Sequence, residues 1–158
     1  TRRSSDLLFH TDPNGMQQLQ ELGEYYQIAP LLNINGYIPR QAILPVMYQS
    51  SILLVLTTLS TPTGTHGIMG TKFFENIGIE KPILCVRSDE ECLADAIQKT
   101  NAGIAATSVD EVKTFIMEKY QEWLQQGYTR QTVINKEQFT RQHEAEQFEQ
   151  LFIQTLKS

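Results

Sequence analysis

The sequence predicts an α/β fold in which a parallel sheet carries helices on both faces. Short apolar runs alternate with amphipathic stretches along nearly the whole chain, which is the pattern of strand–helix–strand units. Residues 52–56 are continuously apolar, as expected for a parallel strand buried on both faces. Helix-capping signals recur at the starts of the amphipathic stretches. Together these observations predict a three-layer architecture, with the sheet between two layers of helices.

The first part of the chain contains two short strands and two helices. Residues 7–9 are an apolar run, and the Asp-Pro pair at 12–13 suits the N-cap and first position of a helix of about three to four turns. Residues 31–34 predict the second strand. Residues 39–48 are predicted to be helical, with Pro45 kinking the helix or delaying its start.

The middle of the chain contains the most distinctive segment. After the strand at 52–56, nine of the fourteen residues at 57–70 are Thr, Ser or Gly. A short helix is predicted at 71–77, with Gly78 placed to end it, and residues 82–86 predict another buried strand.

The last part of the chain contains three predicted helices and one strand. Ser88 with Glu91, and Ser108 with Glu111, have the spacing of capping boxes that open two helices. A strand is predicted between them at 102–106, and residues 125–136 are polar and irregular. The final helix is predicted to face the core with one apolar stripe, made of Ala145, Phe148, Leu151, Phe152 and Leu156.

Size and charge exclude several classes of protein. The 158 residues suit one compact domain, and 13 Lys and Arg against 18 Asp and Glu give a net charge of −5. The basic residues are scattered, so neither a nucleic-acid groove nor an anionic-membrane patch is expected as the main surface. Cys85 and Cys92 lack disulfide and metal-ligand spacing, which indicates reduced interior thiols and a cytoplasmic setting. Because the chain begins with Thr1, we expect it to be a piece of a longer protein.

The segment at 57–70 is the place where a ligand is expected. Ligands of parallel α/β sheets bind outside the carboxyl ends of the strands, and this segment leads into a helix N-terminus that favours anions. Lys72 adds a positive charge, and Glu75 could accept hydrogen bonds from a ribose diol. An idle polar loop, with an ion pair between Lys72 and Glu75, remains the alternative. Neither a Walker P-loop nor the dinucleotide fingerprint is present.

One stretch resembles a known family. The glycine-rich loop followed by Gly-Thr-Lys-Phe-Phe-Glu-Asn-Ile-Gly-Ile-Glu-Lys-Pro-Ile-Leu at 70–84 resembles the donor-site segment of GT-B glycosyltransferases. It is most similar to the family-four type found in bacterial surface-polysaccharide clusters. Three further stretches resemble that family's turn after the third strand, its last strand and its closing helix; they lie at 35–39, 101–103 and 139–141.

The resemblance implies a nucleotide-sugar-binding domain covering residues 1–158, with roles for particular residues. Glu75 would hold the ribose hydroxyls, the backbone near Gly67 would cradle the diphosphate, and Tyr37 would flank the nucleobase. The residues implied at the nucleotide are Tyr37, Ile38, Arg40, Gly67, Gly70, Thr71, Lys72 and Glu75. Those implied near the donor sugar are Thr63, Gly64 and His66.

The chain departs from the family at two points. Many members have a second glutamate eight residues before the ribose-binding one, and this chain has Gly67 there. The family's first strand, which occupies the sheet centre, would lie upstream of Thr1. Its absence would leave the strands at 7–9 and 52–56 each with an unpaired edge. We expect this gap to be closed by direct pairing, by exchange with a second copy, or by another segment.

The predicted function is that of the donor-binding, carboxyl-terminal half of a glycosyltransferase. The parent protein would move a sugar from a nucleotide diphosphate donor to a hydroxyl acceptor, with the acceptor site in an absent amino-terminal half and no metal or further cofactor. This fragment alone would bind nucleotide weakly and turn nothing over. The parent would be cytoplasmic or peripheral to the inner face of a membrane. A non-catalytic interaction module with the same fold is the main alternative. A flavodoxin-like or receiver domain is a third possibility, but it would need an acidic cluster at the end of the first strand or a flavin-binding loop, and neither is evident in this sequence.

Overall fold

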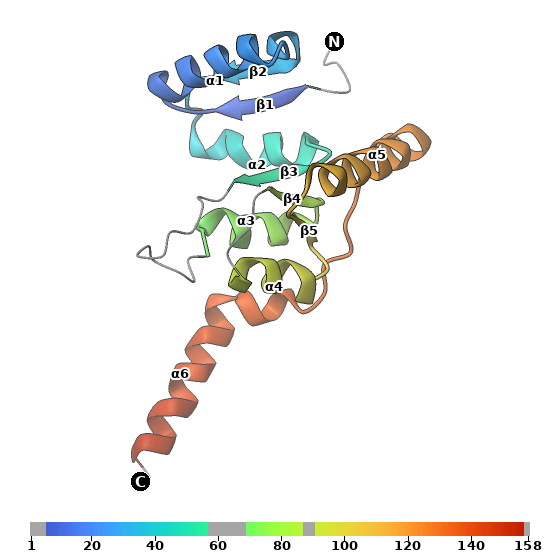
Figure 1. The fold of residues 1–158 in the computed structure, drawn as a ribbon. Coiled ribbons are helices and arrows are strands. Elements are labelled where there is room, and N and C mark those ends of the chain that lie inside the picture. The colour runs from blue at the N-terminus through green and yellow to red at the C-terminus, as the bar shows by residue number, and fades with distance from the viewer. Residues whose placement is uncertain (1–5, 57–68, 87–90, 157–158) are drawn as a thin grey trace. The chain divides into compact units, whose positions relative to one another are not determined.

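The chain has an α/β fold with parallel strands. The computed structural model describes residues 6–56, 69–86 and 91–156 (Figure 1). Its packing forms two compact units, Thr1–Val46 and Met47–Ser158. Strands and helices alternate as the sequence predicts, and within the described residues every strand pair is parallel. That the whole chain is one domain stays a prediction.

The first unit is a strand–helix–strand arrangement. Its elements are β1 (Leu7–His10), α1 (Pro13–Tyr25), the 3₁₀-helix η1 (Ala29–Leu31), β2 (Leu32–Asn35) and the start of α2 (Arg40–Gln49). The cap predicted for α1 is confirmed, because the Asp12 side chain accepts a hydrogen bond from Gly15 N at 2.7 Å. Pro45 lies inside α2, so the predicted delay of the helix start was wrong, and the alternative of a kink at Pro45 stays a prediction.

The first unit has very little core of its own. Among its described residues only Gly23 is buried, and the exposed side chains include Tyr25 and Tyr26. An isolated two-stranded sheet is marginal in water, because it buries too little apolar surface to offset the chain entropy. With only α1 packed against it among the described elements, the β1–β2 pair is therefore expected to be less stable than the sheet of the second unit.

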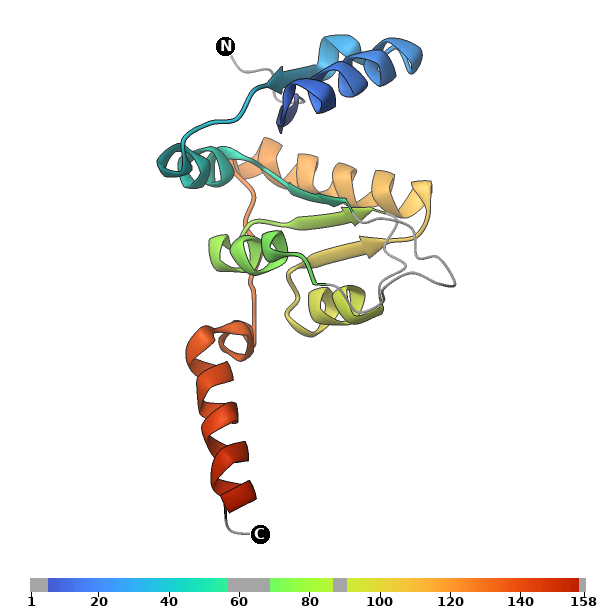
Figure 2. The same cartoon turned by 90° about the vertical axis from the view of Figure 1, so that its left-hand side faces the viewer.

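The second unit is a three-layer α/β/α arrangement around one parallel sheet in the order β3-β4-β5. Its elements are β3 (Leu53–Leu56), α3 (Thr71–Ile79), β4 (Ile83–Val86), α4 (Glu91–Lys99), β5 (Gly103–Ala106), α5 (Val109–Gln126), η2 (Lys136–Phe139) and α6 (Arg141–Leu156). Figure 2 shows α3 and α4 on one side of this sheet and α5 on the other.

The alternation of side chains along β4 explains the two layers. Ile83 and Cys85 point into a cluster with residues of α3 and α4, whereas Leu84 points into a second cluster with Phe115 of α5. Because successive side chains of a strand point to opposite faces, one apolar strand can hold both layers of helices. Cys85 is fully buried and Cys92 is half-buried, and no disulfide joins them.

The strand β3 is buried on one face only. Leu53 and Val55 are buried, but Leu54 is 37% exposed and Leu56 is 66% exposed, which corrects the expectation of burial on both faces. Leu54 lies on the same side of the sheet as Leu84, where α5 packs mainly against β4 and β5. Among the described residues β3 pairs only with β4. Likewise, β1 pairs only with β2, and no described strand pairs with the free edge of either.

Two helix ends refine the capping predictions. Gly78 does not end α3, because the helix continues to Ile79 and the left-handed residue that follows is Glu80, with φ of 58°. The capping box of Ser108 and Glu111 is confirmed at the start of α5. The corresponding box at Ser88 lies outside the described residues.

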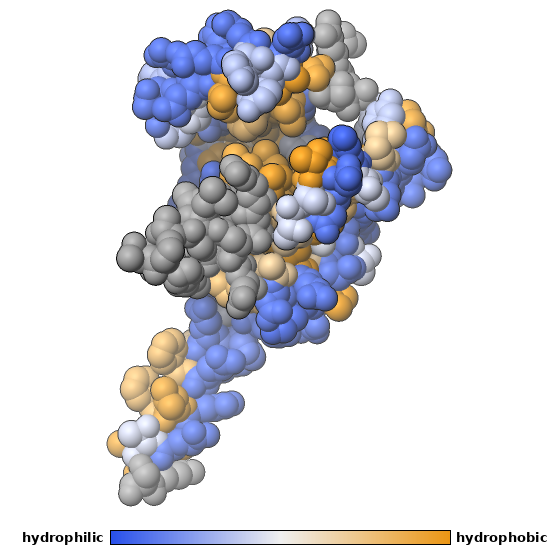
Figure 3. Space-filling model, viewed as in Figure 1, coloured by the Kyte–Doolittle hydropathy of each residue, from blue (hydrophilic) through white to orange (hydrophobic). Residues whose placement is uncertain are grey.

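The last helix leaves its apolar stripe in solvent. The exposed fractions are 61% for Phe148, 56% for Leu151, 64% for Phe152 and 87% for Leu156, so the prediction that this stripe faces the core was wrong. The principal packing contact of α6 is with η2, and Figure 3 shows apolar colour along the side of α6 that is in view. Hydrophobic periodicity identifies an apolar face correctly without revealing whether the chain contains a surface to cover it.

Candidate functional site

The N-terminus of α3 is the described part of the predicted ligand site. The N-cap is Gly70, which makes no side-chain cap hydrogen bond, and Phe73 N donates to Gly70 O at 3.0 Å. The first N–H groups of a helix have no partner within the helix, and the helix dipole makes this end electropositive. A glycine at the N-cap thus leaves these donors uncovered by its own side chain, which suits an anionic group.

The side chains of α3 divide into a buried face and an exposed face. Phe73, Asn76 and Ile77 are buried, whereas Lys72 and Glu75 are exposed. The helical period places the apolar residues against the sheet and turns the two charged residues outward. The alternative of an ion pair between Lys72 and Glu75 finds no support, because no such pair is present within the described residues.

The residues predicted near the nucleobase lie in the other unit. Tyr37 is 76% exposed, Ile38 is half-buried and Arg40 is the exposed first residue of α2. Their turn is held to the end of β1, where His10 Nδ1 lies 3.1 Å from Gly36 O. The structure thus brings Gly70, Thr71, Lys72 and Glu75 together on α3, separately from Tyr37, Ile38 and Arg40.

The remaining predicted residues are Thr63, Gly64, His66 and Gly67, and all four lie outside the described residues. Together with the residues of α3 and of the first unit, they remain a prediction.

Sequence reasoning missed a polar residue on the buried face of α3. Asn76 is only 4% exposed, next to the exposed Glu75. A polar side chain that occupies a position of the apolar period is the sequence signal that could have identified it, because Asn76 follows Phe73 by three residues and precedes Ile77.

The segment from 127 to 135, called the strap below, was also underestimated by sequence reasoning. It is irregular as predicted, with no helix or strand from 127 to 135, but it is tied to the turns at the amino ends of the strands. Gln131 N donates to Glu80 O at 3.0 Å, Ile134 N donates to Thr100 O at 2.9 Å, and Thr129 donates its hydroxyl to Ser51 O. These bonds satisfy backbone carbonyls that helix and strand ends leave unpaired.

A charged cluster joins the end of α3 to the strap and to η2. Lys136 Nζ lies 2.6 Å from one carboxylate oxygen of Glu80, and the Arg130 guanidinium lies 3.0 Å from the other. The hydrogen bonds from Lys136 and Arg130 lower the pKa of Glu80. Burial lowers the pKa of Lys81, whose ammonium donates to Thr129 O at 3.1 Å.

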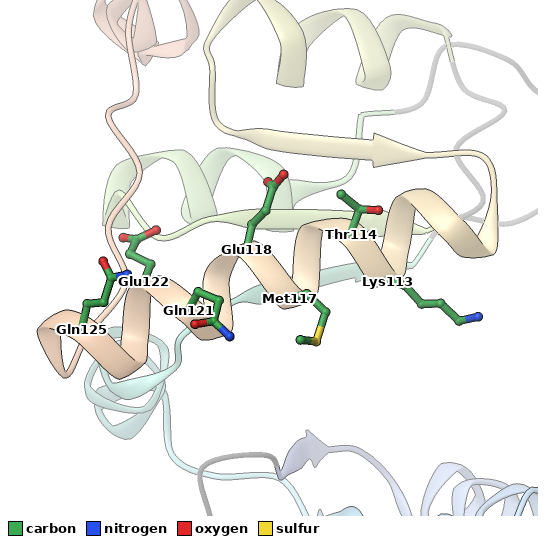
Figure 4. A pocket seen from close by; sticks show the side chains of 7 residues that line it. All are labelled: Lys113, Thr114, Met117, Glu118, Gln121, Glu122 and Gln125. Atoms are coloured by element: carbon green, nitrogen blue, oxygen red, sulfur yellow. The ribbon is translucent and has the colours of Figure 1, made fainter.

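Two concave surfaces of the described residues lie away from the start of α3. A shallow groove of about 710 Å³ runs along α5, and Figure 4 shows its seven lining side chains, all from that helix. A smaller hollow of about 250 Å³ lies beside Lys81 and Tyr128. Neither is lined by Gly70, Thr71, Lys72 or Glu75. A groove walled by one helix is a surface feature, and we assign no ligand to it.

The described residues show neither a metal-binding cluster nor a membrane-spanning helix. They contain no group of three or more His, Cys, Asp or Glu residues arranged to hold a metal ion. None of the helices among them has both the length and the apolar character needed to cross a membrane.

Comparisons with models of protein families, with characterised proteins and with solved structures found no match in any of the three. Inference about function therefore depends on the residues of this chain and on the resemblance of its central segment.

Proposed function

We propose that this chain is the donor-binding part of a GT-B glycosyltransferase, with a Rossmann-like fold that lacks its first strand. The parent enzyme transfers a sugar from a nucleotide diphosphate sugar to a hydroxyl acceptor, and the acceptor site belongs to a half absent from these residues. The observation that carries the proposal is the start of α3, where an uncapped helix N-terminus, Lys72 and Glu75 are exposed together within the stretch that resembles the family's donor site.

The chemistry of these groups supports the proposed roles. The N–H groups at the start of α3 and the Lys72 ammonium stabilise the negative charge of a departing diphosphate. Glu75, one turn farther along, accepts hydrogen bonds from the hydroxyls of a ribose. The resemblance assigns Tyr37, Ile38 and Arg40 to the nucleobase, and Thr63, Gly64 and His66 to the donor sugar. The general base and the acceptor come from the other half, so the fragment binds donor and transfers nothing.

Thermal unfolding with nucleotides tests this proposal. The chain is melted with UDP, GDP, ADP and their sugar conjugates, and a ligand at 100 times its Kd adds about 2.7 kcal/mol of stability. We expect at least one nucleotide to raise the Tm, and Glu75→Ala to remove most of the rise. The matched control is Glu118→Ala, which removes an exposed glutamate from α5. An equal rise in wild type and Glu75→Ala would refute the role of Glu75.

A non-catalytic interaction module is the second candidate, favoured by the edges of β1 and β3 with which no described strand pairs, and by the exposed apolar stripe of α6. It predicts that no nucleotide changes the Tm. It also predicts association through these surfaces, including strand exchange between two copies, which light scattering of the purified chain measures.

A further inference from the structure

One short turn, η2, packs against the helix α3, although it follows α3 by nearly sixty residues in the sequence. The Phe139 ring of η2 meets the Phe73 ring at a centroid distance of 5.5 Å, edge to face, and the Phe74 ring at 6.1 Å. Phe73 and Phe74 are themselves 5.6 Å apart. Edge-to-face aromatic contacts of this kind have a preferred geometry and therefore orient the groups that carry them.

The same turn also holds the other end of α3. Lys136, three residues before Phe139, forms the 2.6 Å ion pair with Glu80, the residue that caps α3. The two residues just before η2 are hydrogen-bonded to the end of α4. Ile134 N donates to Thr100 O at 2.9 Å, and Asn135 Nδ2 lies 3.4 Å from Lys99 O. α3 is thus fixed near both of its ends by one turn anchored on the end of α4.

The two phenylalanines of α3 that contact Phe139 are sequence neighbours of the exposed charged residues of α3. Phe73 and Phe74 lie directly between Lys72 and Glu75 in the sequence of α3. A shift or rotation of α3 that follows a change at the aromatic contact must therefore move both charged side chains and the N–H groups of the first turn. Displacements of about 1 Å at a binding group weaken or abolish its hydrogen bonds.

From these contacts we infer that Phe139 is a positioning residue for the ligand site on α3. It touches no ligand, and it acts by holding the orientation of the helix that presents Lys72 and Glu75. This inference deepens the proposed function and rests on it for the identity of the ligand, a nucleoside diphosphate. The coupling between η2 and α3 is independent of that identity.

The experiment compares Phe139→Leu with Phe115→Leu in the 158-residue chain. Phe115 is 8% exposed in the cluster on the opposite face of the sheet, so its variant makes the same Phe-to-Leu change at a buried site away from α3. Isothermal titration with UDP, GDP and ADP is performed well below the Tm of both variants. We expect Phe139→Leu to raise the nucleotide Kd about tenfold and Phe115→Leu to leave it within twofold, with Phe139→Tyr restoring the wild-type value.

Hydrogen exchange decides the inference even without nucleotide binding. The amides of α3 are compared with those of β4 in each variant. We expect about tenfold faster exchange in α3 of Phe139→Leu, beyond any change in β4, and no selective effect in Phe115→Leu. Equal exchange and equal Kd values in the two variants would overturn the positioning role. Selective loosening of α3 in a chain that binds no nucleotide would overturn the proposed function and keep the coupling.

Discussion

Among the described glycines, Gly103 has the least room for a side chain, because β5 packs closely against β4 at this position. Gly103 lies opposite Ile83 in the parallel register, and a Cβ at position 103 would lie 1.9 Å from Ile83 O and 2.6 Å from Ile83 N. A carbon atom normally approaches a carbonyl oxygen no closer than about 3.3 Å. Gly103→Ala therefore has to push the two strands apart by more than about 1 Å.

The energetic cost follows from what that movement breaks. Ile83 N donates to Ala102 O at 2.9 Å, and Ile83 and Ala102 are both 0% exposed. Separation leaves buried backbone groups unpaired, at about 1–3 kcal/mol each, and loosens the packing of both residues. We expect Gly103→Ala to lower the free energy of unfolding by about 3–5 kcal/mol.

Urea unfolding followed by fluorescence measures this loss, because the single tryptophan, Trp123, lies on α5 of the same unit. The matched control is Gly78→Ala within α3, where an added Cβ has nothing within 4 Å. There the better helix propensity of alanine should stabilise the chain by about 0.5–1 kcal/mol. A loss below about 1 kcal/mol for Gly103→Ala would refute the reasoning from the strand contact.

Three further predictions concern other parts of the chain. Phe148→Ser and Phe152→Ser on the exposed stripe of α6 should each change the free energy of unfolding by less than about 0.5 kcal/mol. Phe73→Ala, at a site 1% exposed, should lower it by about 3–5 kcal/mol. A large loss for either α6 variant in urea titrations would contradict the observed exposure. Glu80→Gln should lower stability at neutral pH, because the lowered pKa of Glu80 means that its ion pairs stabilise the fold above the ordinary value of 4.5. This deficit should shrink as the pH falls below 4.5, and unfolding curves with a constant deficit down to pH 2 would disprove the assignment. Amides of β1 should exchange at least about 100-fold faster than those of β4, because the first unit has almost no buried residues; equal protection in hydrogen exchange would show that it is stable.

Local signals predicted the elements well because their causes are local. The Asp12 cap, the Ser108–Glu111 box and the apolar runs depend on residues within a few positions of one another, so their structures follow from spacing alone. The end of α3 is an exception. Glycine is the usual left-handed residue after a helix, but Glu80 takes that role, held by Lys136 and Arg130 from about fifty residues away.

The candidate site was likewise predictable only in the part that depends on local sequence. The sequence predicts Lys72 and Glu75 as ligand-binding residues of the helix at 71–77, and the structure leaves both side chains exposed on α3. The buried Asn76 and the ring of Phe139 against α3 were not foreseen, because one interrupts the period and the other comes from a distant segment.

The amino-acid sequence by itself determined the α/β class, the parallel strands and the places of most helices, because these follow from short-range periodicity and capping. Only the tertiary structure decided which apolar faces find a partner. It buries β4 on both faces, leaves one face of β3 and the stripe of α6 exposed, and sets η2 against α3. The physical reason is that burial depends on surfaces brought together from distant parts of the chain, which periodicity does not encode.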